Sequence, residues 1–374
     1  MTSSRLTLAG AALALALCAP GAALAGPSAL ISGSVYVDHW WIQDPEVQRR
    51  SPGSVTIDAA VKVSVDVTDD VSFSTKACMS CHGIELEHFQ MEFMPKTWFN
   101  VAAGRLAIPF GEFANRVDQS GHKTVSSPLI YDMGRMAYGE RSAMNLGVIP
   151  LPYTDTGVMI YGQRFLGPIQ AWYGLYGVAG LRGGNDADWT AMRALYYSDP
   201  NRVPSGGGRL VFTYASDPGA FIGDSSIGGS YTAGRYDQEA LLDYEAWGVD
   251  ASFQLGKLTL RGEYAHRKTD LSTEASYPYE LVDPWFTKEG WYAEAEVPLG
   301  GWLGAVYRYD TLDRRGAPLP GSTELTPESH LVRHTGGLVF TPAANTFVKL
   351  MWEYWLASDF PDFHSVHFGV GGAF

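Results

Sequence analysis

The sequence predicts an all-β protein, a transmembrane antiparallel β-barrel of about sixteen strands with a long inward loop. Three observations favour this fold class. Short segments alternate between apolar and polar residues, as membrane strands do. Aromatic residues make up 13% of the chain, with 20 Tyr, 11 Trp and 42 Gly, a mixture typical of short strands, tight turns and aromatic girdles. The chain ends on Phe374, a terminal aromatic that closes an alternating strand and indicates the outer membrane.

Residues 1–25 are predicted to be a signal peptide. An apolar run follows Arg5, and Ala23-Leu24-Ala25 supplies a small-x-small cleavage site. The run is too short to span a bilayer core of about 30 Å. Cleavage would leave residues 26–374 as one mature barrel domain outside the inner membrane, with two of the three cysteines. The net charge of −13 argues against nucleic acid as a partner.

The strands follow one another as hairpins. In 257–265, Leu258, Leu260 and Tyr264 are expected to face lipid while the residues between them face the lumen. Short turns are predicted at Asp69-Asp70, Pro95-Lys96, Leu166-Gly167-Pro168, Asp217-Pro218-Gly219, Gly256-Lys257, Leu299-Gly300-Gly301 and Pro342-Ala343-Ala344. The expected lumenal charges suit either a wet channel or an interior sealed by ion pairs; they are Arg261, Glu263, Arg308, Asp310, Lys349 and Glu353.

The stretch "AAGRLAIPFGEF" (102–113) resembles the strand and proline turn of the phosphate-selective porin O/P type of barrel. The hairpin layout is similar to that family over most of the mature chain. The longest connection, 111–154, follows this turn and carries Arg116, His122, Arg135 and Arg141. Connections of this length are usually functional or disordered. Because the third outer loop of porins folds inward, the resemblance implies that 111–154 is a constriction loop.

The stretch "STKACMSCHGIELEHF" (74–89) contains the attachment signature of a c-type haem. Cys78 and Cys81 have the spacing that forms two thioethers, and His82 would be the proximal ligand of the iron. A zinc site needs further ligands, and a thioredoxin-like dithiol needs a βαβ setting. A disulfide would leave His82 unexplained. The sequence therefore predicts one covalently bound haem c.

The haem-attachment hairpin is expected at residues 71–94, with the motif at its outward turn and the haem tucked into the lumen under the long loop. His88 lies six strand residues from His82, about 20 Å at about 3.4 Å per residue, so it could reach the same iron only if the chain folded back sharply. We expect it instead to face the lumen in a polar role. His122 on the long loop is a possible distal ligand. Met133, Met136 and Met144 are alternatives, as is an open sixth position.

The combination of a barrel with one haem is similar to the fused outer-membrane cytochrome–porins of iron-oxidising and metal-respiring bacteria. That resemblance implies electron transfer across or at the outer membrane, with a periplasmic cytochrome or an extracellular redox compound as partner. The alternative is a diffusion porin in which the haem is structural or a plug. No acid–base constellation surrounds the motif, so we do not expect an enzyme.

Overall fold

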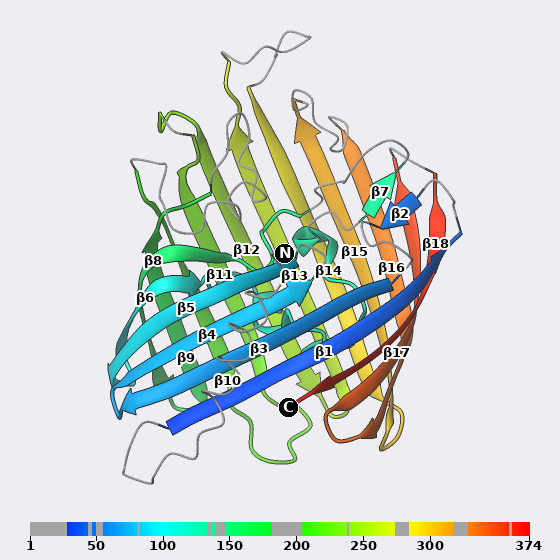
Figure 1. Ribbon diagram of the computed structural model, residues 1–374, viewed down its shortest axis with the longest axis horizontal. Coiled ribbons are helices and arrows are strands. Elements are labelled where there is room, and N and C mark those ends of the chain that lie inside the picture. The colour runs from blue at the N-terminus through cyan, green and yellow to red at the C-terminus, as the bar shows by residue number, and fades with distance from the viewer. Residues whose placement is uncertain are drawn as a thin grey trace, which may run out of the picture.

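The protein is described here from a computed structural model, which covers residues 28–43, 47–49, 55–80, 83–132, 136–138, 147–181, 203–237, 239–273, 284–317, 328–358 and 361–374. The predicted signal peptide, residues 1–25, lies outside these ranges. The chain forms a closed antiparallel barrel of sixteen strands, so the predicted fold class is confirmed (Figure 1). Consecutive strands pair with each other, and β1 (Ser28–Ile42) closes the ring between β3 (Val55–Thr68) and β18 (Phe363–Ala373).

The other barrel strands are β4 (Val71–Ser80), β5 (Gly83–Lys96), β6 (Phe99–Ala107), β8 (Thr154–Leu166), β9 (Ile169–Val178), β10 (Ser205–Tyr214), β11 (Ser225–Arg235), β12 (Asp243–Leu255), β13 (Leu258–Asp270), β14 (Trp285–Pro298), β15 (Leu303–Gly316), β16 (Ser329–Ala343) and β17 (Thr346–Ala357). Outside the ring, β2 (Val47–Arg49) pairs with β7 (Met136–Tyr138). Two short 3-10 helices, η2 (Phe113–Arg116) and η3 (Leu129–Tyr131), lie between β6 and β8. No helix in the described ranges is long and apolar enough to cross a membrane.

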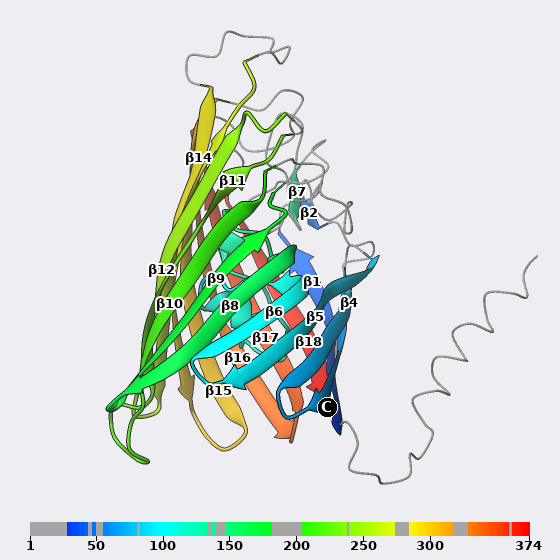
Figure 2. The ribbon, with the colours of Figure 1, turned by 90° about the vertical axis from the view of Figure 1, so that its left-hand side faces the viewer.

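Short turns lie at one end of the barrel and longer connections at the other, as the sequence predicts. Gly167 (φ +64°) and Gly256 (φ +58°) take left-handed conformations in two of the short turns, where a side chain would be strained. Strand β4 has 10 residues, whereas β3 and β5 have 14 each. The β4–β5 hairpin accordingly ends far below the tops of β12 and β14 (Figure 2). The barrel therefore has one low side.

The strands alternate between an apolar outer face and a polar lumenal face. On β17, Leu350 and Trp352 are 44% and 42% exposed, while Lys349 and Glu353 are 1% and 3% exposed. Other barrel strands repeat this pattern, which gives the outer surface a continuous apolar character. A closed ring with such a surface satisfies its backbone hydrogen bonds within the membrane. The predicted outer-membrane location is confirmed.

The C-terminal residue takes part in closing the barrel. The Phe374 backbone N–H donates to Gly33 O at 2.9 Å, and the Gly33 N–H donates to Phe374 O at 3.0 Å. Strand β18 therefore stays paired with β1 up to the last residue of the chain.

Candidate functional site

The chain between β6 and β8 turns into the barrel. The Ile108 N–H donates to Tyr153 O at 2.8 Å and closes the base of this excursion. Its described parts, 108–132 and 147–153, are called the inward loop below. Their hydrogen-bond partners on the wall are lumenal side chains of β11 and of β13 to β17. The predicted inward loop is confirmed, and it ends at Tyr153, just before β8.

An apolar core holds the inward loop against the wall. Phe113, Leu129 and Ile130 are fully buried and belong to one cluster with Leu312 on β15 and Trp355 on β17. Burying a side chain of this size contributes about 1.5–3 kcal/mol relative to leaving it exposed. The loop is therefore packed in place as a small hydrophobic core inside an otherwise polar lumen.

Basic side chains of the wall hold the loop backbone. Arg308 on β15 donates to Thr124 Oγ1 at 2.7 Å and to Ser126 O at 3.0 Å. Lys349 on β17 donates to Gln119 O at 2.7 Å and to Thr124 O at 2.9 Å. Each contact satisfies a buried loop oxygen that would otherwise have lost its water. These cations are thus occupied by the loop.

Acidic side chains of the wall accept hydrogen bonds from the loop. Glu263 on β13 accepts from the Tyr131 hydroxyl and from the Phe113 N–H at 3.4 Å. Asp310 on β15 accepts from the Leu129 N–H at 3.1 Å. Burial, and then the charge of Glu263, raise the pKa of Tyr131 well above its ordinary value, so this phenol stays protonated and remains a donor.

The opposite edge of the loop faces open space inside the barrel. Arg116 lies on this edge and pairs with Glu112 at 2.8 Å and with Glu294 of β14 at 3.2 Å. Burial alone would lower the pKa of Arg116, but the two carboxylates more than offset it and raise that pKa. Further residues of the edge are exposed, namely Asn115, Ser120, Gly121 and Lys123. Water therefore reaches the loop from within the lumen.

An ion pair joins this edge to the low side of the barrel. Lys76 on β4 lies 2.8 Å from Asp118 of the loop and 2.9 Å from Glu87 of β5. The neighbouring His88, paired with Lys76 in the strand register, is buried on the lumenal side, as expected from the sequence. We call the Lys76–Asp118 contact the latch.

The predicted haem-attachment hairpin corresponds to β4 and β5. Cys78 continues the lumenal row of Ser74 and Lys76, whereas Met79 is exposed on the outer face. This orientation fits a thioether directed into the lumen. Cys81 and His82 lie outside the described residues, so the second thiol and the proximal ligand are not placed. Among the residues that are described, no group of three or more His, Cys, Asp or Glu could hold a metal ion. Covalent haem stays a prediction.

The possible distal ligand, His122, lies in the packed part of the inward loop. Its ring packs against Phe113 with centroids 5.2 Å apart, and its Nδ1 lies 3.2 Å from Thr124 Oγ1. The imidazole is buried, so iron could reach it only if this part of the loop moved. Its ligation stays a prediction. The side chains of the thioether alternatives lie outside the described set: Met133, Met136 and Met144.

Ser365, His367 and Asp38 form a hydrogen-bonded chain in the order found in serine hydrolases. The distances are 3.0 Å from Ser365 Oγ to His367 Nε2 and 3.1 Å from His367 Nδ1 to Asp38 Oδ2. The three residues are only 3%, 2% and 2% exposed, and the Glu353 carboxylate lies 3.7 Å from the same Nε2. Because a substrate cannot reach the serine in this state, we assign the chain to wall structure.

All six charged side chains that were expected in the lumen lie on the lumenal side. Five are buried, and Arg261 is partly exposed. Arg308, Asp310 and Lys349 are sealed against the loop, whereas the Arg261 side chain is 18% exposed and pairs with Glu296 at 2.6 Å. Sequence reasoning missed the latch. Strand alternation could place Lys76 in the lumen, but no pattern in the irregular loop pointed to Asp118 as its partner.

Comparison with known proteins finds similarity at the level of structure. No protein-family model matches the chain, and no curated protein matches its sequence. The anion-selective porin from Comamonas acidovorans is 12% identical with a TM-score of 0.58, covering 93% of this chain and 100% of that one. OmpF of Salmonella typhi, solved in complex with daunomycin, is 10% identical with a TM-score of 0.55, covering 93% and 98%.

A third solved structure, the outer membrane channel DcaP of Acinetobacter baumannii, is 11% identical with a TM-score of 0.53. The alignment covers 95% of this chain and 100% of that one. At these identities the similarity establishes the fold alone. The chain thus shares the barrel of outer-membrane porins.

Proposed function

We propose that this protein is a passive diffusion channel of the outer membrane, in which the inward loop narrows the lumen without sealing it. One observation carries the proposal. The loop packs into a buried cluster that reaches strands from β6 round to β18, but exposed and half-exposed polar residues along its edge, among them Glu112, Asn115 and Lys123, face the inside of the barrel. A plug would bury that edge on both sides. The apolar outer surface would be in contact with outer-membrane lipid.

The similarity to porins and to an outer membrane channel supports this proposal, since their barrel is shared over nearly the whole chain. The pairing of charges along the edge supports it further. Arg116 is balanced by Glu112 and Glu294, and Arg261 by Glu296, so polar groups line the passage without a strong barrier of one sign.

Liposome swelling tests the proposal. Vesicles containing the purified protein should swell in solutions of small neutral sugars, at a rate that falls as the sugar becomes larger. Vesicles prepared with heat-denatured protein are the control. Swelling no faster than in the control vesicles would show that the barrel is sealed.

A second candidate function is electron transfer through a covalently bound haem c. The observation that favours it is the position of Cys78, whose side chain faces the lumen on the low side of the barrel at the end of a hairpin that leads into Cys81 and His82. A haem bound there would supply one-electron chemistry. A periplasmic cytochrome or an extracellular redox compound would have to complete the path, because the hydrocarbon core alone is about 30 Å thick.

The absorption spectrum of the purified protein tests this candidate. Bound haem c would give a Soret band and a band on denaturing gels that stains for haem peroxidase activity. A protein exported through a cytochrome c maturation system that shows neither signal would not be a cytochrome.

A further inference from the structure

We propose that small organic carboxylates bind in a cavity at the turn end of the lumen, between Lys123 of the inward loop and Lys257 of the β12–β13 turn. This inference deepens the proposed channel function and rests on it for its biological route, although binding can be measured without transport. The turn end is the periplasmic end in barrels of this type.

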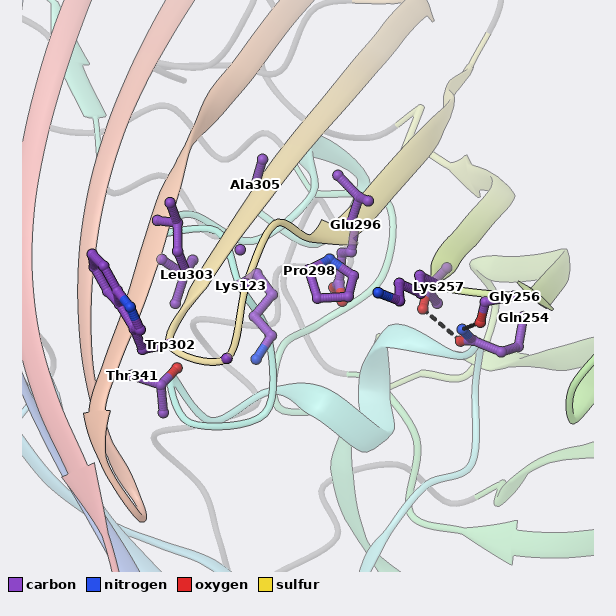
Figure 3. A pocket seen from close by; sticks show the side chains of 16 residues that line it. Lys123, Gln254, Gly256, Lys257, Glu296, Pro298, Trp302, Leu303, Ala305 and Thr341 are labelled. Atoms are coloured by element: carbon purple, nitrogen blue, oxygen red, sulfur yellow. Dashed lines mark hydrogen bonds between the residues drawn. The ribbon is translucent and has the colours of Figure 1, made fainter. Parts of the chain in front are cut away.

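The cavity has a volume of about 480 Å³ and is built from three separate parts of the chain (Figure 3). Lys123 comes from the loop, Gly256 and Lys257 from the β12–β13 turn, and a third wall from the β14–β15 turn with the end of β16. Its size falls within the range of about 300–1,000 Å³ that is usual for small-ligand sites. A ligand there would contact the loop and the wall at once.

Two lysines and one carboxylate give the lining of the cavity a net positive charge. Among the described residues, neither Lys123 nor Lys257 takes part in an ion pair or a hydrogen bond. The one carboxylate of the lining, Glu296, pairs with Arg261 Nη1 at 2.6 Å and also interacts electrostatically with Lys123. By contrast, the lumenal lysines Lys76 and Lys349 are fully engaged with protein groups. In a chain with a net charge of −13, this concave site thus carries two ammonium groups and a single carboxylate.

The other residues that line the cavity favour an anion with a hydrocarbon portion. Val297, Pro298, Leu303 and Val339 cover part of the surface, and Thr259 and Thr341 add hydroxyl groups. Figure 3 shows the Lys257 ammonium directed towards Pro298, with Lys123 extending into the space between Pro298 and Thr341. An ammonium binds a carboxylate by charge-assisted hydrogen bonds, while the apolar residues take the hydrocarbon portion.

The walls are held by backbone hydrogen bonds. The Thr341 N–H donates to Trp302 O at 2.8 Å and ties β16 to the β14–β15 turn. Within that turn, the Leu299 N–H donates to Leu303 O at 2.8 Å. The site therefore exists before a ligand arrives, which reduces the ordering cost of binding.

The test is a saturation-transfer NMR titration of the full-length purified protein with benzoate, and with benzyl alcohol as its uncharged counterpart. We expect saturable binding of benzoate and at least about tenfold weaker binding of benzyl alcohol, because the alcohol cannot form the charge-assisted hydrogen bonds that a carboxylate forms with the ammonium groups. The double variant Lys123→Gln/Lys257→Gln should bind benzoate at least about tenfold more weakly than the wild type. Lys268→Gln, at the other end of β13, is the matched control and should bind as the wild type does.

Three results would overturn the inference: no saturable benzoate binding, equal binding of benzyl alcohol, or unchanged binding in the double variant. Liposome swelling with the same preparations separates this inference from the channel proposal. Swelling without benzoate binding rejects the carboxylate site and leaves the channel. Benzoate binding without swelling rejects the channel and leaves the site.

Discussion

Lys76 on β4 and Asp118 on the inward loop form an ion pair with an N–O distance of 2.8 Å. This latch reaches the loop from across the lumen, since β4 stands on the other side of the ring from β13, where Glu263 accepts hydrogen bonds from Phe113 and Tyr131. The loop is thus fixed by a large buried interface with much of the wall and, at Asp118, by a partly exposed ion pair. The polar contact is the weaker of the two, so it is where the width of the passage can change.

Asp118→Asn removes the charge of the latch but keeps its shape. The Asp118 side chain is 40% exposed, so the pair contributes only about 0.2–1 kcal/mol. We expect the population of detached loop edge to rise by up to about fivefold, seen as greater open-channel current noise with unchanged thermal stability. Asp69→Asn, in a short turn, is the control. Equal noise in the wild type and Asp118→Asn would show that the latch does not restrain the loop.

Lys349→Met tests the buried side of the loop. The substitution leaves Gln119 O and Thr124 O buried without their donor, and each loss costs about 1–3 kcal/mol. We expect the free energy of unfolding, measured by urea titration in detergent, to fall by at least about 2 kcal/mol. Lys257→Met removes an exposed turn lysine and should change the free energy of unfolding by less than about 0.5 kcal/mol. Equal stability of the two variants would contradict the anchoring role.

Tyr131 predicts a dependence of stability on alkaline pH. Burial, followed by the charge of Glu263, raises its pKa in the folded protein, so folding favours the protonated phenol. The stabilisation is complete below the unfolded value of about 10 and is lost as the pH rises above it, by up to about 1.36 kcal/mol per pH unit. Between about pH 10 and 12, Tyr131→Phe should lose less stability than the wild type. If urea unfolding showed the wild type and Tyr131→Phe losing the same free energy of unfolding over that range, this assignment would be refuted.

Cys78→Ala tests covalent haem attachment without disturbing the folding of the barrel. Cys78 lies near the end of β4, beyond the latch, so its loss should leave folding and swelling activity unchanged. If haem c is bound, staining of the denatured protein for covalent haem should disappear or weaken markedly. Met79→Ala, at the next position on the outer face, should retain the stain. A variant that stains like the wild type would exclude attachment through Cys78.

The regular part of the fold could be predicted because strand alternation has a fixed period. Leu350 and Trp352 on the outside, and Lys349 and Glu353 inside, follow directly from that period, as does the row that ends at Cys78. Tight turns could be predicted from residues such as Gly256, whose positive φ requires glycine or a similarly tolerant residue.

The contacts of the inward loop could not be predicted, because irregular backbone has no period. Its Arg116 and His122 were noticed as residue types, but their partners Glu294 and Phe113 depend on the three-dimensional path of the loop. The same holds for the cavity beside Lys123, which needs turns far apart in sequence to meet. Local patterns define the wall, and long-range packing defines the site.

Single-channel recording in planar bilayers shows whether the inward loop narrows the lumen and leaves it open. We expect stepwise, ohmic conductance increments from the purified wild-type protein, with increased current noise in Asp118→Asn. A properly folded, heat-modifiable barrel that inserts without any conductance, in the wild type and in Asp118→Asn alike, would contradict this expectation.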